Sequence, residues 1–155
     1  MIARIRVLSA VAIAMAMCGA VQADEGQEAY QRCVVCHQPD GAGIPGVFPA
    51  LKDRLAPIVE TVEGREYLTL VLAEGLRGTI SIEGQAYMGA MPAQGLTDAQ
   101  IAAVLNYIVA GFGNSGATES KNLLSEEEVA GVRSKYSGAN AKSALDLRTE
   151  VPALN

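Results

Sequence analysis

Apolar residues recur at helical spacing in the middle of the chain. Over residues 63–76 they stand three or four positions apart, which places them on one face of a helix, and glycines follow. The members of this face are Leu68, Val71, Leu72 and Leu76. The pattern predicts one amphipathic helix here, and the residues at 25–35 favour a second, shorter helix.

A third helix is predicted to open at Thr97, which begins a capping box. In this motif a hydroxyl accepts a hydrogen bond from the amide three residues on, and the side chain there, Gln100, bonds back. Apolar residues then follow at helical spacing until Gly111 ends the helix.

A second capping box begins near the C-terminus. It pairs Ser125 with Glu128 and predicts a helix over residues 125–136. The small, polar residues 114–124 are predicted to be a linker to this helix. Residues 137–155 have mixed charges and weak periodicity, so they are predicted to form an extended or disordered tail.

The remaining segments have turn and strand signals. Residues 38–50 are so rich in glycine and proline that a compact loop is predicted, and residues 51–62 support one helical turn that stops near Pro57. Residues 79–87 alternate around a Glu-Gly pair, which predicts a minimal β-hairpin. The glycine and proline of residues 88–92 predict a loop after it.

The first residues have the organisation of a secretory signal peptide. Two arginines precede an apolar run over residues 7–21, and Val-Gln-Ala comes before Asp24. Cleavage of residues 1–23 is predicted, with export of a soluble chain to the periplasm and no membrane span afterwards. A retained anchor would need a run of about 20 apolar residues. Lipidation of Cys18 would call for a small residue where Met17 stands.

The charge of the predicted mature chain is clearly acidic. The 12 basic residues lose two arginines with the signal peptide, so 10 stand against 17 acidic residues, a formal charge of −7. Nucleic acid is excluded as a partner because its phosphates would be repelled. A partner protein with a basic or neutral docking patch is favoured.

Two cysteines and one histidine carry the clearest chemical signal. Cys33 and Cys36 are the only cysteines after the signal peptide, and His37 is the only histidine. A disulfide framework would have more cysteines, a thioredoxin-type dithiol would lie in a βαβ unit, and a zinc site would need a fourth ligand. Two thiols at this spacing reach the two vinyl groups of a porphyrin, with the histidine beneath the iron. One covalently bound haem c is therefore predicted.

The second axial ligand of the iron follows by elimination. His37 cannot be paired with another histidine, and only Met88 and Met91 remain after the signal peptide. Met91 is favoured because Pro92 stiffens its backbone, whereas Met88 is suited to packing at the haem edge. His/Met ligation raises the reduction potential and leaves no site for oxygen chemistry, which predicts electron transfer. If Met91 were only a core residue, the iron would be open and the function different.

These motifs resemble the class I c-type cytochromes. The resemblance covers residues 24–112 and rests on the order of four segments: Cys-Val-Val-Cys-His, residues 43–51, Met91-Pro92-Ala93 and a final Leu-Thr-Asp helix that contains Tyr107. It implies an all-α, class I cytochrome c fold over residues 24–113, with three to four core helices around one haem and an extra C-terminal helix.

The resemblance also implies particular contacts. The first and last core helices are expected to cross at Gly26, Tyr30 and Tyr107. The carbonyl of Pro49 is expected to accept a hydrogen bond from the ring of His37, as a second-shell partner. Apart from the resemblance, Arg65 and Arg77 are candidate counter-ions of the haem propionates, although such arginines are more often solvated. Tyr67 and Tyr87 are candidate hydrogen-bond donors to a propionate or to the ligand loop, although packing beside the porphyrin is the more common role.

The function predicted from the sequence is a periplasmic electron-transfer protein that meets donor and acceptor proteins at its haem edge. Residues 67–91 are similar to those of cytochromes, or haem domains, that serve periplasmic dehydrogenases or nitrite reductases. The helix after Gly113 keeps an alternative open, a non-catalytic cytochrome subunit of a multi-subunit dehydrogenase or reductase. A third alternative is a haem-based gas sensor in which Met91 is displaced. A monomer or a subunit of a complex is expected.

Overall fold

A computed structural model describes residues 25–114 and 124–154 of the chain. The predicted signal peptide and most of the predicted linker lie outside these residues. The described elements, in chain order, are a helical segment at residues 25–30, α2 (Val34–His37), α3 (Ala56–Val59), α4 (Val62–Glu74), β1 (Gly75–Ile82), β2 (Gln85–Pro92), α5 (Asp98–Ala110), α6 (Glu126–Lys135), α7 (Ala144–Arg148) and the 3-10 helix η2 (Pro152–Leu154).

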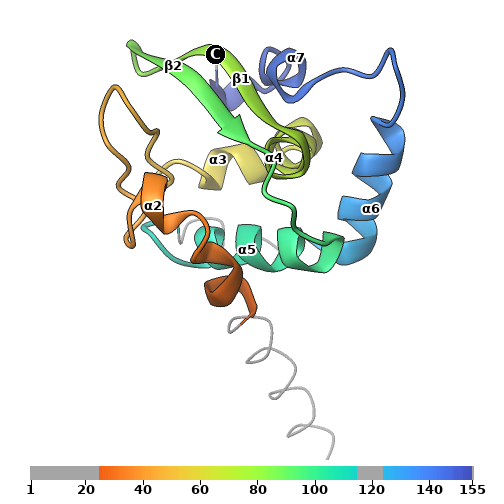
Figure 1. Cartoon of the computed structure of the whole chain (residues 1–155), viewed down its shortest axis with the longest axis horizontal. Helices are drawn as coiled ribbons and strands as arrows, with labels where there is room; N and C mark the ends of the chain where they lie inside the picture. The colour runs from red at the N-terminus through yellow and green to blue at the C-terminus, as the bar shows by residue number, and fades with distance from the viewer. Residues whose placement is uncertain (1–24, 115–123, 155) are drawn as a thin grey trace, which may run out of the picture.

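The helices surround a single apolar core, and the only sheet in the described part of the chain is the two-stranded β1–β2 hairpin. In Figure 1, α5 lies along the lower side and the hairpin along the upper side, with α3 and α4 between them. Helix α6 packs against α4 and α5, α7 packs against α4 and β1, and η2 packs against α3. The mostly helical architecture confirms the predicted fold class.

Helix α5 forms as the sequence predicts. Thr97 Oγ1 accepts from the Gln100 amide at 3.2 Å, and Gln100 Oε1 accepts from the Thr97 amide at 3.1 Å, so the capping box is complete. Ile101 and Val104 of its inner face are fully buried. Burial of a side chain of this size contributes about 1.5–3 kcal/mol.

The first helical segment crosses α5 at a glycine. A Cβ atom on Gly26 would collide with the carbonyl oxygen of Ala103 and stand 2.6 Å from the Tyr107 Cβ. Next to this crossing, the ring of Tyr30 lies 5.7 Å from that of Tyr107 and 5.0 Å from that of Phe112, measured between centroids. The crossing implied by the family resemblance is therefore present.

The hairpin is longer than predicted. Its turn is the expected Glu83-Gly84 pair, with φ of 50° and 80°, but its strands extend to Gly75 and Pro92. The loop predicted over residues 88–92 was wrong, because these residues form the end of β2. Pro92 is tolerated there because the sheet has only two strands and the proline stands at the end of one of them.

Two smaller predictions change at a proline and at a glycine. Pro57 stands in the first turn of α3, next to the residue that begins the helix, and does not stop it, since the first turn needs no amide donor. Helix α4 ends at Glu74, because Gly75 has φ of 86° and ψ of 178°, and Leu76 therefore belongs to β1.

The C-terminal segment is more ordered than predicted. Helix α6 lies within the predicted range, but its capping box is only half formed: Ser125 Oγ accepts from the Glu128 amide, while the Glu128 carboxylate pairs with Arg65 at 2.7 Å.

The extended or disordered tail predicted after α6 instead contains α7 and η2. Ser143 and Asp146 cap α7 reciprocally, and Leu147 and Val151 are buried four residues apart. Lys142 and Glu150, two of the charges that suggested disorder, pair on its outer face, whereas Arg148 is buried.

Candidate haem site

Cys33, Cys36 and His37 are presented by one short turn of helix. The Cys33 amide donates to the Tyr30 carbonyl at 2.8 Å, and the His37 amide donates to the Cys33 carbonyl at 2.8 Å. Gln38 ends this turn with φ of 67°, and its carbonyl accepts the Tyr30 hydroxyl at 2.7 Å. The segment is thus fixed at both ends, and all three side chains face one pocket.

Both thiols are free and neither is fully exposed. Burial raises the pKa of Cys33 to about 11, and the neighbouring Cys36 adds to this rise while Arg32 opposes it. The Cys33 thiol is therefore protonated near neutral pH. Within the described residues, no three His, Cys, Asp or Glu side chains gather as metal ligands would.

The His37 ring is buried and oriented. Its Nδ1 lies 2.8 Å from the carbonyl oxygen of Pro49, and because that oxygen can only accept, Nδ1 carries the proton. Burial lowers the pKa of His37, while the hydrogen bond to Pro49 opposes this shift. The imidazole is thus held neutral with Nε2 left to act as an electron-pair donor.

Two adjoining pockets meet at this histidine. The outer pocket holds about 300 Å³ and contains Cys36 and the hairpin residues Tyr87 and Met88. The inner pocket extends from there between α3, α4 and α5 and is almost wholly apolar. Six residues line both pockets and mark their junction: Cys33, His37, Pro49, Leu76, Ile80 and Met91.

The two candidate methionines are placed differently. Met91 pairs with Leu76 across the hairpin and is half-buried at the junction of the pockets. Met88 is 79% exposed and lines only the outer pocket. Of the two, Met91 is the one that shares both pockets with His37.

The polar residues of the inner pocket differ from those proposed from the sequence. Tyr67 lines this pocket, but Arg65 is paired with Glu128, and Arg77 is exposed and lines neither pocket. The arginines that line the inner pocket are instead Arg54 and Arg148. Arg148 lies in the segment predicted to be disordered, although the Ser-x-x-Asp cap before it was a usable signal.

The inner pocket is positively charged where Arg54 and Arg148 line it. Burial lowers the pKa of Arg54, the charge of Arg148 lowers it further, and Glu83 opposes the shift. Burial raises the pKa of Tyr67, and the charge and hydrogen bond of Arg148 oppose that rise. Two guanidinium groups therefore share a mostly apolar pocket.

Comparison with known proteins agrees with this geometry. Residues 23–111 match the family model described as "Cytochrome c". The chain belongs to the cytochrome c family. This cytochrome c is 44% identical over 115 residues to cytochrome c-552 of Thermus thermophilus, a match that covers 74% of the chain and 87% of that relative. A second cytochrome c-552, from a specified strain of the same species, is also 44% identical over 115 residues, 74% of the chain and 77% of the relative.

Family membership means that this cytochrome c carries covalently bound haem c and acts as an electron carrier. The described residues fit that group: a pair of thiols at the outer pocket, a neutral imidazole at the junction and an apolar inner pocket with cationic groups at its end. In the part of the chain that the structure describes, no helix is long and apolar enough to span a bilayer.

Proposed function

We propose that this cytochrome c is a periplasmic electron-transfer protein whose haem is attached through Cys33 and Cys36 and whose iron has His37 and Met91 as axial ligands. One observation carries the proposal: His37 and Met91 both line the junction of the two pockets, next to Cys33. The pattern of residues 1–23 supports export to the periplasm.

The protein's part in this function is to hold two donor atoms in place. The Pro49 carbonyl fixes the imidazole, so Nε2 is the nitrogen available to the metal. Pairing of Met91 with Leu76 holds the thioether in the β1–β2 hairpin. Haem c supplies a one-electron iron couple when bound, and a thioether ligand favours its ferrous state.

Substitution of the two methionines tests the ligand assignment. Met91→Ala is expected to keep the haem c absorption bands, to lower the reduction potential and to let the ferrous protein bind carbon monoxide. Met88→Ala is the matched control and is expected to change neither potential nor ligand binding. Equal behaviour of the two variants would show that Met91 is not a ligand of the iron. A reduced wild-type protein without haem c bands would refute the whole proposal.

The same measurement addresses the gas-sensor alternative. Because the proposed site leaves no coordination position free, the ferrous wild-type protein should not bind carbon monoxide. Binding by the wild type at the affinity of Met91→Ala would favour a sensor over a carrier.

The subunit alternative rests on the segment after Gly113. Among its described residues, Val129 and Leu147 are buried in the chain's own core, and Glu128 pairs with Arg65 of α4. Packing within the chain therefore accounts for much of this segment without a second polypeptide. Purification from the native host should yield a protein that elutes at the size of a monomer, whereas a stable complex with a larger subunit would favour the alternative.

A further inference from the structure

Arg54 and Arg148 are held at the inner end of the haem pocket by backbone carbonyls. Arg54 Nη1 donates to the Ala50 carbonyl at 2.9 Å, and Arg148 Nη2 donates to the Ser81 carbonyl at 2.6 Å. These bonds fix the two side chains but use only part of their N–H groups. Arg148 is only 8% exposed, and its hydrogen bond with Tyr67 occupies a further N–H group inside the pocket.

No carboxylate of the described residues neutralises the two arginines. The four ion pairs among the described residues are formed by other side chains. Glu83 acts on Arg54 electrostatically, but it lies beyond the distance of an ion pair. Two like charges in an apolar pocket, one of them buried and the other half-buried, are costly unless an anion joins them.

The positions of the cysteines indicate which anion this is. Cys36 lines only the outer pocket and Cys33 lies where the two pockets meet, whereas Arg54 and Arg148 line only the inner pocket. In haem, the two propionates lie on the edge of the porphyrin opposite the two vinyl groups that react with cysteines. Attachment at the cysteines therefore directs two carboxylates toward the two arginines.

We propose that Arg148 of α7, together with Arg54, pairs with the haem propionates, so that the C-terminal segment is a part of the haem site. The inference rests on the proposed attachment at Cys33 and Cys36. The residues matched by the family model end at 111, and α7 therefore adds to the site from outside that match.

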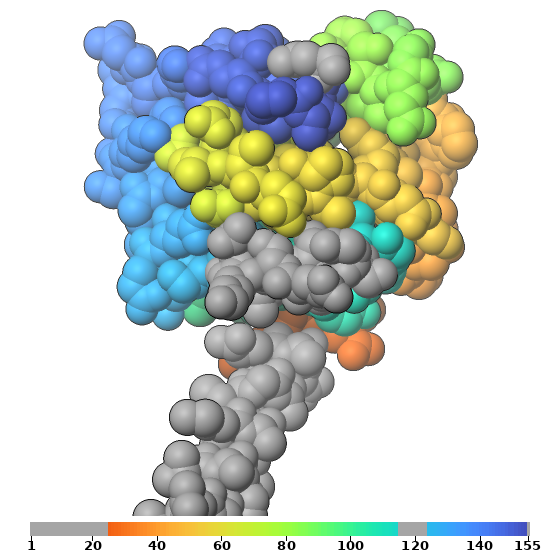
Figure 2. Space-filling view, turned by 180° about the vertical axis from the view of Figure 1, so that it is seen from behind, coloured from red at the N-terminus to blue at the C-terminus, as the bar shows by residue number. Residues whose placement is uncertain are grey.

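The fold brings this segment to the pocket by several independent contacts. Helix α7 packs on α4 and β1, η2 packs on α3, and Leu154 of η2 also lines the inner pocket. Figure 2 shows the dark-blue C-terminal segment against the yellow helices and the green hairpin. Arg148 and Leu154 of this segment therefore form part of the wall of the inner pocket.

The reduction potential tests this pairing. A cation near the propionates favours ferrous haem, so Arg148→Gln should lower the equilibrium constant for reduction about threefold to tenfold, where tenfold corresponds to about 59 mV for one electron. Arg148→Lys keeps the charge and should restore most of the potential. Arg77→Gln, an exposed arginine of β1, is the matched control and should leave the potential unchanged.

A second measurement reports on the propionates themselves. The propionate bands in resonance Raman spectra should shift in Arg148→Gln and in Arg54→Gln, but not in Arg77→Gln, and Arg54→Gln serves if Arg148→Gln does not fold. Unchanged potentials and spectra in haem-loaded variants would overturn the pairing. An equal loss in Arg148→Lys and Arg148→Gln would also overturn it, because a merely structural role predicts that result. A wild type without haem c would instead refute the proposed attachment.

Discussion

The absence of a side chain at Gly26 decides how closely the first helical segment approaches α5. The Ala103 carbonyl and the Tyr107 Cβ occupy the space that a Cβ atom would need, and Tyr30, one turn further on, packs against the same helix. Because Cys33 follows three residues after Tyr30, this crossing also sets where the haem-binding turn begins. The position of the haem-binding turn therefore depends on this helix crossing.

Gly26→Ala is expected to lower the free energy of unfolding by about 2 kcal/mol or more, since backbone atoms cannot move aside as side chains can. Gly131→Ala, on the exposed face of α6 with nothing within 4 Å of the added Cβ, is the control. It should raise the free energy of unfolding by about 0.5–1 kcal/mol. Urea denaturation followed by circular dichroism compares the two, and a neutral Gly26→Ala would contradict the close crossing.

Single residues also show what the sequence could and could not predict. Cys33, Cys36 and His37 form a local motif, so their association was predictable from spacing. Asn114 was assigned to a polar linker, yet it is buried, accepts from the Leu55 amide at 2.8 Å and donates to the Leu51 and Ile108 carbonyls. Its partners lie up to 63 residues away, and no local pattern encodes them.

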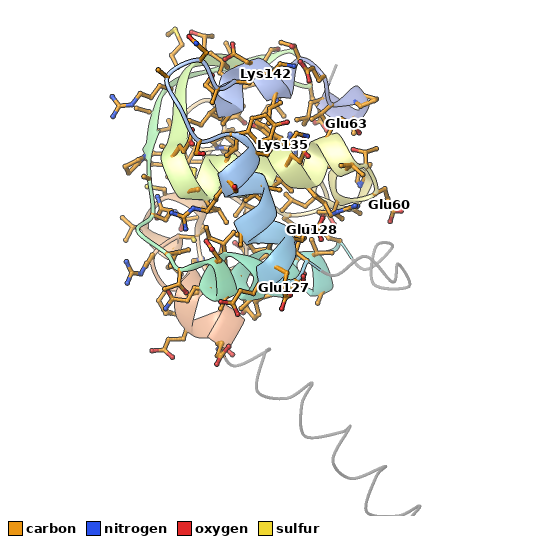
Figure 3. All side chains as sticks on the ribbon, turned by 90° about the vertical axis from the view of Figure 1, so that its right-hand side faces the viewer. Glu60, Glu63, Glu127, Glu128, Lys135 and Lys142 are labelled. Atoms are coloured by element: carbon orange, nitrogen blue, oxygen red, sulfur yellow. The ribbon has the colours of Figure 1, made fainter. Side chains whose placement is uncertain are left out.

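At the scale of elements, α6 is fastened to α4 by charges at both of its ends. Arg65 pairs with Glu128 near the start of α6, and Glu66 accepts from Lys135 Nζ and from the Tyr136 hydroxyl, both at 2.6 Å, near its end. Figure 3 shows the labelled Glu128 and Lys135 on the α6 ribbon, which runs in front of the core. The two contacts hold both ends of α6 against α4, and the chain continues from there to α7.

Glu66 makes this attachment dependent on pH. Burial raises the pKa of Glu66, but the hydrogen bonds from Lys135 and Tyr136 and the charge of Lys135 outweigh it, so the pKa lies below its ordinary value of 4.5. A carboxylate with a lowered pKa stabilises the folded state above its ordinary pKa, and this contribution is lost as the pH falls through the folded value.

Glu66→Gln should therefore cost about 1 kcal/mol of unfolding free energy at neutral pH, a small value because Lys135 is 57% exposed. The difference from the wild type should shrink as the pH falls below about 4.5. Glu60→Gln, an exposed glutamate outside the ion pairs of the described residues, should change little at either pH. Denaturant titrations at the two pH values make the comparison, and a difference that persists in acid would argue against the carboxylate.

Elements were predicted well where capping and periodicity agreed and poorly where tertiary packing decided. The capping residues Thr97 and Gln100 predict the start of α5, and Ser125 predicts the start of α6. The long hairpin depends on pairing of Gly75 with Pro92 across the sheet, and α7 depends on burial of Leu147. Neither contact leaves a strong periodic pattern in so short a segment.

At the scale of the whole molecule, the net charge of the chain is −5, but the mouth of the outer pocket exposes apolar side chains. Val47 and Met88 line this pocket and are 56% and 79% exposed. An electron carrier must meet its partners with the haem edge between them, and a small, transient interface suits fast release. We expect charge to guide the encounter and the apolar rim to make the contact.

Val47→Gln tests these separate roles of charge and apolar contact, because it removes apolar contact without adding charge. Electron transfer to a basic redox protein should slow about threefold or more, while the decline of the rate with ionic strength should keep its slope. Val62→Gln is matched in residue type and in exposure, since Val62 is also 56% exposed, but it lies at the start of α4 and lines neither pocket. Stopped-flow rates for the two variants should therefore differ at every salt concentration. Equal rates would mean that the partner docks elsewhere, and a changed salt slope in Val47→Gln would mean that this rim acts through charge.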